Sequence, residues 1–288
     1  MSAAYNADIV SKVTDQTMKI VSFNVNGIRA RMHQLEAIKQ QLAADVLGLQ
    51  EVKAMPDQLP LDEISALGWH TEVHSQKAHY GVATLSIEKP LTVQKGFPSD
   101  DDESQKRFIH TSHKTPNGET LHILNGYFPQ GENRSHETKF PAKEKYYADL
   151  LSYLENNFNP DDNVIVMGDI NVAPIDQDIG IGAVNAKRWL KTGKCAFLPE
   201  EREWVAKLTS WGLVDSYRLL NPSINDRFSW FDYRSRGFED EPKRGLRIDL
   251  IMITKPLVDR LINAGINYDV RGMEKPSDHA PIFIELDY

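Results

Sequence analysis

The sequence predicts an α/β fold in which helices pack on a mixed sheet. Three observations lead to this prediction. Short apolar runs of strand length recur along the chain, stretches with helical periodicity separate many of them, and one run followed by an extended stretch is typical of a hairpin. Strands that alternate with helices favour a layered architecture with parallel pairing, whereas hairpins add antiparallel pairs. Both kinds of pairing are therefore expected.

Six apolar segments are expected to be strands, and each carries polar residues at or near one end. They are residues 19–27, 45–51, 121–131, 164–171, 246–254 and 275–286, and a hairpin strand is expected at 81–87. In VIVMGDIN (164–171), the four apolar residues are expected to form a strand that is buried on both faces. Gly168 is expected to end this strand. The polar residues of the six segments are Asn24, Asn26, Glu51, Asn125, Tyr127, Asp169, Asn171, Asp249, Asp278 and His279.

Three stretches have the periodicity of amphipathic helices. Their apolar residues are Leu35, Ile38 and Leu42 in the first, Tyr147, Leu150, Leu151, Leu154 and Phe158 in the second, and Trp204, Leu208 and Trp211 in the third. Pro199 is expected to open the third helix, with Glu200 and Glu201 in the first turn, where carboxylates favour the helix dipole.

The bulk composition favours a single domain over residues 18–288. The chain has 288 residues, 41% of them hydrophobic, and no repeat or linker divides it. Residues 1–17 are polar and lack the pattern of a secretory signal, so we expect a mobile extension or a short local helix there. No apolar run is long enough to span a membrane. The single cysteine, Cys195, allows no internal disulfide, is expected to be a small buried hydrophobe, and fits a reducing compartment.

The charge of the chain gives a mixed indication about nucleic acid. The net charge of −8 argues weakly against nucleic-acid binding. However, Lys187, Arg188, Lys191 and Lys194 fall within eight residues that contain no acid, and a second basic stretch covers residues 227–247. Such clusters are either solvated surface or contacts to phosphates, and the composition alone does not choose between these interpretations.

The polar strand ends predict a divalent-metal site if they converge. An Asp and an Asn after one strand are ordinary turn formers. Six such ends are harder to explain as turns, because buried carboxylates without partners are costly and repel each other. A cation would offset the charge of Glu51, Asp169, Asp249 and Asp278. Hard oxygen ligands, and the absence of a Cys/His zinc pattern, favour Mg²⁺ or Mn²⁺.

Motifs that carry a family resemblance run from about Met18 to the end of the sequence. They are SFNVNGIRAR, LGLQEVK, HYGVA, NGYFPQG, KFPAKEKYY, VMGDINVAP, GLRIDLI, EKPSDHAP, KRWLKTGKCAFLPEEREW and RFSWFDYRS. The strand-end motifs among them identify a superfamily, and the last two identify one branch of it. With these motifs the sequence resembles the bacterial exonuclease III family, a branch of the abasic-site endonucleases within the endonuclease/exonuclease/phosphatase superfamily. Residues 1–17 have no counterpart there, Asn26 stands where some relatives have Asp, and the loop GFEDEPKRG is slightly long.

The resemblance implies a DNase I-like, four-layered α/β sandwich, with two packed mixed sheets flanked by helices and the site at one edge. It implies a divalent-metal-dependent DNA repair nuclease that cleaves 5′ to abasic sites, acts as a 3′–5′ exonuclease on duplex DNA and removes 3′ blocking groups. The expected partner is duplex DNA with abasic sites or 3′ ends. The protein is expected to act as a monomer, in the bacterial cytoplasm, associated with the nucleoid through DNA.

The resemblance also implies roles for the strand-end residues. Glu51 is expected to be the main Mg²⁺ ligand, with Mn²⁺ as a substitute, and the full metal-binding set is Asn24, Glu51, Asp169, Asn171, Asp278 and His279. Asp169 is the expected general base, held by Asn24 and Asn171. His279, oriented by Asp249, is expected to contact the phosphate as an imidazolium. A rival assignment makes His279 the base and Asp169 the acid for the leaving group.

The remaining expected site residues contact the substrate. Tyr127 is expected to reach the phosphate or leaving group, with a packed loop aromatic as the alternative. Trp230 and Phe231 have the aromatic character that suits stacking next to an abasic sugar, with core packing as the alternative. The expected phosphate contacts are Arg107, Lys187, Arg188 and Arg234.

Two other functions compete with this one. Phosphoinositide or sphingomyelin hydrolysis would use the same metal site, but those relatives lack the KRWLKTGKCAFLPEEREW block. A DNA-binding module on an inactive scaffold would lack some of the site residues, whereas all of them are present here.

Overall fold

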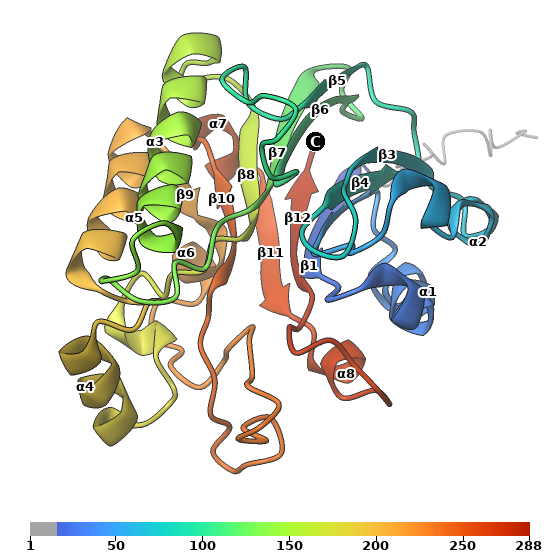
Figure 1. The fold of residues 1–288 in the computed structure, drawn as a ribbon. Helices are drawn as coiled ribbons and strands as arrows, with labels where there is room; N and C mark the ends of the chain where they lie inside the picture. Colours follow the sequence, from blue (N-terminus) through green and yellow to red (C-terminus); the bar gives the residue numbers. More distant parts are fainter. Residues whose placement is uncertain (1–15) are drawn as a thin grey trace, which may run out of the picture.

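Two six-stranded sheets lie face to face in the middle of the molecule, and helices cover both outer faces (Figure 1). The computed structural model describes residues 16–288, so the expectation for the N-terminal extension lies outside the described residues except for its last two positions. The strands are β1 Thr17–Asn24, β2 Val46–Gln50, β3 His70–His74, β4 Val82–Ser86, β5 Thr92–Lys95, β6 Phe108–Lys114, β7 Thr120–Tyr127, β8 Val164–Asp169, β9 Val214–Asp215, β10 Asp249–Ile253, β11 Leu261–Ile266 and β12 Ile282–Asp287.

Both sheets are mixed, as the sequence predicts. One has the strand order β11-β12-β1-β2-β4-β3 and the other β5-β6-β7-β8-β10-β9. Within the first, β1 and β2 are parallel; within the second, β7 and β8 are parallel, and the other pairs are antiparallel. The expected four-layered sandwich is confirmed.

The helices belong to two outer layers and to the connections between strands. They are α1 Met32–Leu42, α2 Leu61–Ala66, α3 Lys139–Asn157, α4 Ala183–Thr192, α5 Pro199–Trp211, α6 Ser216–Leu220, α7 Lys255–Val258 and α8 Tyr268–Arg271, with 3₁₀ turns at Ile28–Ala30, Pro56–Gln58 and Asp176–Asp178. The three expected helices correspond to α1, α3 and α5, and Pro199 opens α5 as expected. None of the helices in residues 16–288 is long and apolar enough to cross a membrane.

The central strand β8 is buried on both faces, because its side chains alternate between two cores. Val164 and Val166 pack with residues of α3 and α5 in the outer core of its sheet. Ile165 and Met167 pack between the two sheets, together with residues of β1 and β12. The four apolar residues of VIVMGDIN therefore form the doubly buried strand that the sequence predicts.

Gly168 does not end β8, contrary to the sequence-based expectation. The strand continues to Asp169, with Gly168 paired to Gly126 of β7 and to Leu250 of β10. Its φ is 142°, and a Cβ atom at this position would lie 1.9 Å from the carbonyl oxygen of Gly126. The glycine is needed because two backbones approach closely, and pairing on both sides carries the strand through it.

Two other strand predictions are wrong, one in the start of the strand and one in its pairing partner. Strand β10 begins at Asp249, so this residue opens the strand and does not interrupt it. The segment before it is not part of the sheet, because Leu246 forms isolated bridges with Ile179 and Trp230, which lie in loops. Strand β4 pairs with β3 and β2, whereas the extended stretch after it, β5, joins the other sheet. The expected hairpin therefore forms with the preceding strand.

Candidate active site

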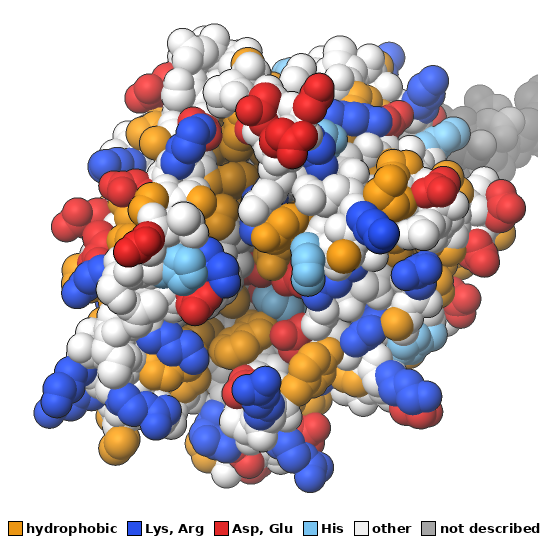
Figure 2. All heavy atoms as spheres, viewed as in Figure 1, with side chains coloured by type: hydrophobic (Ala, Val, Ile, Leu, Met, Phe, Trp, Pro, Cys, Tyr) orange, Lys and Arg blue, Asp and Glu red, His pale blue; other side chains and the backbone are white. Residues whose placement is uncertain are grey.

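Strand ends from both sheets meet at one edge of the sandwich. Strand β1 ends at Asn24 and β8 ends at Asp169, while β10, antiparallel to β8, begins at Asp249 directly opposite Asp169. His279 lies shortly before β12, the antiparallel neighbour of β1. Figure 2 shows a hollow at the centre of this face, with acidic and histidine side chains inside it and many Lys and Arg side chains below it. The topology brings together residues that are far apart in the sequence.

Asp169 is buried and held by two amides. The side-chain nitrogen of Asn24 donates to Asp169 Oδ2 at 3.0 Å, and the backbone N–H of Asn171 donates to Oδ1 at 3.0 Å. The side-chain nitrogen of Asn171 donates to the carbonyl oxygen of Phe128 at 2.9 Å. Both carboxylate oxygens of Asp169 therefore have a fixed direction.

His279 lies between two carboxylates. Its Nδ1 is 2.8 Å from Asp249 Oδ2, and its Nε2 is 3.8 Å from Asp169 Oδ2. Ser229 holds the backbone of Asp249, because its Oγ accepts hydrogen bonds from the N–H groups of Ile248 and Asp249 at 3.0 Å each. Asp249 orients the ring so that Nε2 faces Asp169.

The surroundings of this pair change both pKa values. Burial alone would lower the pKa of His279, but the charges of Asp249 and Asp169 outweigh it and raise this pKa to about 10. Burial, Asp249 and Glu51 raise the pKa of Asp169 above its usual value, whereas His279 and Asn24 oppose this and favour the ionised carboxylate. The imidazole therefore carries a proton at neutral pH.

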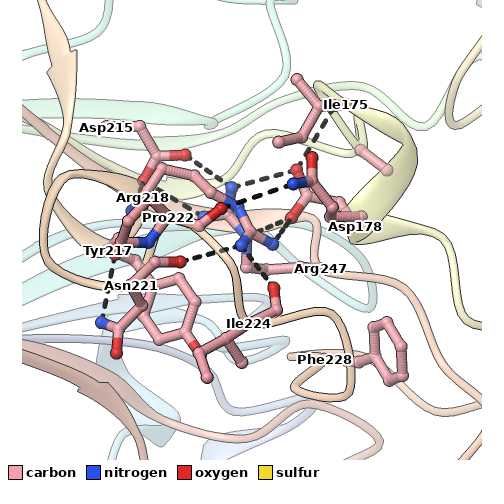
Figure 3. A network of polar contacts seen from close by, with 12 residues as sticks. Ile175, Asp178, Asp215, Tyr217, Arg218, Asn221, Pro222, Ile224, Phe228 and Arg247 are labelled. Carbon is pink, nitrogen blue, oxygen red and sulfur yellow. Dashed lines mark hydrogen bonds and ion pairs between the residues drawn. The ribbon is translucent and has the colours of Figure 1, made fainter.

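A buried ion network fixes the segment that leads into Asp249 (Figure 3). Arg247, 1% exposed, binds both oxygens of the fully buried Asp178 at 2.7 and 3.0 Å, and it also pairs with Asp215. Arg218 adds a bond to Asp178 at 2.6 Å. The network joins the segments that contain Asp178, Asp215 with Arg218, and Arg247. Arg247 lies two residues before Asp249, so the network holds the start of β10 in place.

Glu51, Asp169 and His279 form a group that could hold a metal ion. Each offers one potential ligand atom, and these atoms lie within 4.8 Å of one another. A protonated His279 cannot ligate a metal, so its charged form leaves Glu51 and Asp169 as the ligands. Asn24 links the two carboxylates, since its amide also donates to Glu51 Oε1 at 2.9 Å. The ammonium group of Lys53 lies 2.6 Å from Glu51 Oε2, so this oxygen is paired with a positive group. The carboxylate oxygens of Glu51 and Asp169 are hard ligands of the kind that bind a divalent cation such as Mg²⁺.

Lys53 also explains the charge state of Glu51. Burial would raise the pKa of Glu51, but Lys53 and Asn24 outweigh it and lower this pKa. Lys53 was not predicted as a site residue, although it lies in the motif LGLQEVK. Ser229, in RFSWFDYRS, was missed for the same reason: neither residue type by itself indicates contact with a residue of the site.

Asp278 is bonded through both carboxylate oxygens. Asn26 donates to Oδ1 at 2.7 Å, and the indole N–H of Trp230 donates to Oδ2 at 3.1 Å. Asp278 therefore lies next to the Glu51 group but outside it, which favours a supporting role over direct ligation. The amide of Asn24 likewise donates to the carboxylates, which suits orienting them.

Tyr127 and Arg107 lie together at the end of β7. The guanidinium of Arg107 is 4.5 Å from the ring of Tyr127 and 4.1 Å from that of Tyr80, and it donates to the carbonyl of Tyr127 at 3.0 Å. Burial, with the charges of Glu51 and Asp169, raises the pKa of Tyr127 well above its usual value. Its hydroxyl therefore stays protonated and can donate a hydrogen bond.

The two aromatic residues expected to contact DNA differ in the structure. Phe231 is fully buried in a cluster with Phe238 and Tyr268, which favours the core-packing alternative for this residue. Trp230 is partly exposed and lines a pocket with Trp189. The expected phosphate contacts Lys187, Arg188 and Arg234 are exposed, the first two on α4, a helix with no buried residue.

The chain is similar to DNA repair nucleases over nearly all of its length. The family model described as "Endonuclease/Exonuclease/phosphatase family" matches residues 21–279. The chain is 55% identical over 269 residues to the exodeoxyribonuclease III of Haemophilus influenzae, covering 93% of this chain and 100% of that protein. It is 28% identical to the DNA-(apurinic or apyrimidinic site) endonuclease of Dictyostelium discoideum, covering 96% of this chain and 72% of that protein.

Solved structures of such enzymes share the fold. The 3′ phosphatase NExo from Neisseria, bound to a product DNA hairpin, has a TM-score of 0.84 at 31% identity, covering 94% of this chain and 100% of that one. An AP endonuclease from Archaeoglobus fulgidus has a TM-score of 0.84 at 30% identity, with the same coverage.

Proposed function

Because the chain belongs to the endonuclease/exonuclease/phosphatase family and is a DNA repair nuclease, we propose that it hydrolyses the phosphodiester 5′ to abasic sites. We further propose that it removes nucleotides from 3′ ends of duplex DNA and clears 3′ blocking groups. The observation that carries the proposal is the buried array of Asp169, His279 and Asp249 beside Glu51. The names of the relatives, an exodeoxyribonuclease III, an AP endonuclease and a 3′ phosphatase, support the three activities.

In the proposed reaction, Asp169 is the general base. Its two oxygens are aimed by Asn24 and Asn171, and the neighbouring charged His279 favours the ionised carboxylate that a base needs. His279, charged at neutral pH, faces the phosphate and stabilises its negative charge. The pH profile of the rate separates this assignment from the rival one, in which a neutral His279 is the base. Tyr127 donates its hydroxyl proton in a hydrogen bond to the phosphate or leaving group.

The cofactor is proposed to be Mg²⁺, with Mn²⁺ as a substitute, and Glu51 is proposed as its main ligand. When bound, the cation supplies positive charge where the phosphate gains negative charge in the transition state. Asn24 orients Glu51 and Asp169 toward each other. Asp278 supports the site through Asn26.

The proposed substrate is bound by exposed basic side chains around this edge, among them Lys187, Arg188 and Arg234. The protein is proposed to work as a monomer, since one copy contains all of the site residues. Its proposed place of action is the bacterial cytoplasm, on the DNA of the nucleoid.

The test is cleavage of a duplex that contains one abasic site, with Mg²⁺ and with EDTA. We expect a single cut 5′ to the site with Mg²⁺ and none with EDTA. Glu51→Ala should raise the Mg²⁺ concentration for half-maximal rate, whereas Glu155→Ala, at an exposed position of α3, should leave it unchanged. Full cleavage in EDTA, or hydrolysis of phosphoinositide or sphingomyelin in place of DNA, would overturn the proposal.

A further inference from the structure

Helix α3 binds the backbone of the segment that follows Asp169. The ammonium group of Lys143 donates to the carbonyl oxygen of Asn171 at 2.8 Å, and the hydroxyl of Tyr147 donates to that of Ile170 at 2.7 Å. Lys143 and Tyr147 are four residues apart and therefore lie on the same face of α3. The carbonyl groups that they bind belong to consecutive residues. One face of α3 thus fixes two peptide groups next to the proposed general base.

This segment has a conformation that needs such support. Asn171 has a φ of 55°, in the left-handed region that costs free energy for a residue other than glycine. In this conformation its N–H donates to Asp169 Oδ1. If the segment relaxed, the hydrogen bond that aims the carboxylate would be lost.

The cation of Lys143 is itself fully buried and paired. Its partner is Glu201 of α5, also fully buried, and the two charged groups are in contact. The other oxygen of Glu201 accepts from the N–H groups of Ala196 and Leu198 at 2.9 and 2.8 Å. Buried ion pairs are on average no more stabilising than apolar residues of similar size. An apolar residue could not, however, donate a hydrogen bond to the carbonyl of Asn171.

We propose that Lys143 and Tyr147 are positioning residues for phosphodiester hydrolysis, which aim Asp169 by holding the carbonyl groups of Ile170 and Asn171, and that Glu201 holds Lys143 in place. The inference rests on the proposed function, since it concerns the same site. Lys143 is fully buried and Tyr147 is 3% exposed, so neither can contact DNA. Their loss should therefore lower kcat and leave the KM for DNA almost unchanged.

The first test is Tyr147→Phe, with Tyr153→Phe as the matched control. Both tyrosines are buried on α3, and Tyr153 donates or accepts its hydrogen bond at His110 on β6, away from the site. We expect Tyr147→Phe to lower kcat about three- to tenfold, the effect of one hydrogen bond, with KM changed less than about twofold. Tyr153→Phe should lose a similar amount of stability and keep kcat. Equal kcat values for the two variants would overturn the proposal.

The second test is the pair of changes Lys143→Met and Glu201→Gln in one chain. It leaves no buried unpaired charge, and the amide oxygen introduced by Glu201→Gln can still accept from the N–H groups of Ala196 and Leu198. We expect kcat to fall about 10- to 100-fold, as for other small misplacements of a reacting group. Parental kcat in this folded variant would overturn the proposal.

A third measurement separates this inference from the proposed function. Amide hydrogen exchange at Ile170 and Asn171 should be faster in Tyr147→Phe than in the parent, and unchanged in Tyr153→Phe. This readout needs no substrate. If the parent does not cut abasic DNA, the proposed function fails; if exchange at these amides is unchanged in Tyr147→Phe, the positioning role fails.

Discussion

At the scale of single residues, the surroundings of Asp169 and His279 determine what each can do. The carboxylate is surrounded by amide donors and the imidazole by carboxylates. A carboxylate kept ionised by a neighbouring imidazolium suits proton abstraction, and a buried His with a raised pKa suits charge stabilisation. The roles can therefore be tested one at a time.

Asp169→Asn should lower the single-turnover rate by about two decades or more, the usual contribution of a general base. The variant keeps the shape of the side chain, so DNA should bind as well as before or better, because one negative charge near the phosphate is gone. Rapid-quench kinetics measure the rate, and fluorescence anisotropy measures the affinity. Asp259→Asn, at an exposed position, is the control. Near-parental turnover would mean that VIVMGDIN is only a strand and its turn.

The alkaline limit of activity should report on His279. Its pKa is raised to about 10, so the charged form persists through neutral pH, and the rate should fall as the pH rises through about 10. Asp249→Asn removes the carboxylate 2.8 Å from Nδ1, lowers this pKa and should shift the falling limb to lower pH. The measurement is the single-turnover rate against pH at saturating Mg²⁺. A limb that stays in place would favour His279 as the neutral base.

At the scale of elements, α4 packs on the protein through few residues, Ala186 and Trp189, which contact a small cluster that includes Phe197. It has no buried residue, and its exposed side chains include Lys187 and Arg188. A mostly exposed helix whose Arg188 lines a pocket with Trp230, the residue that binds Asp278, suits contact with DNA phosphates. Substitutions on its surface should leave the free energy of unfolding within about 0.5 kcal/mol of the parent.

The salt dependence of DNA affinity tests whether α4 contacts DNA phosphates. If Lys187 and Arg188 bind phosphates, each change to Ala should reduce the slope of log affinity against log salt by about one. The rate of the pre-bound complex should not change, because neither residue is among those around Asp169. Lys207→Ala, on the exposed face of α5, should keep the parental slope. Parental slopes for both α4 variants would exclude this helix from the DNA path.

At the scale of the whole molecule, the site is made by two sheets, each of which contributes strand ends. Asn24 comes from one sheet, Asp169 and Asp249 come from the other, and the segment with His279 leads back into the first. The net charge of −8 includes the acids of this site, so it does not describe the basic surface that faces the proposed substrate.

Removal of residues 1–15 should leave the activity unchanged. The residues of the site lie between Asn24 and His279, and β1 begins at Thr17 with its pairing to β12 complete. We expect kcat/KM on abasic DNA within about twofold of the parent and an unchanged unfolding midpoint. A loss of more than about tenfold would instead assign the extension a part in substrate binding.

The local chemistry of the strand ends could be predicted from the sequence, because it depends on short-range pattern. Apolar runs predict β1, β2, β7 and β8, and stretches of helical periodicity predict α1, α3 and α5. The sequence encodes which face of a segment is buried through a period of two residues in a strand and 3.6 residues in a helix. The motifs around Glu51, Asp169 and His279 then identified the family. The pairing of β4 and the start of β10 were missed, because they depend on partners distant in the sequence.

Only the tertiary structure decided which polar groups meet. No local pattern shows that Lys53 pairs with Glu51, that Ser229 fixes Asp249, or that Phe231 is packed in an aromatic cluster. No local pattern shows the partners of Lys143 and Tyr147 either, because the apolar stripe of α3 that begins at Tyr147 predicts only that one face of the helix is buried. The physical reason is that the periodicity of a segment records whether a side chain is buried, whereas its hydrogen-bond partner depends on how separate strands and helices pack.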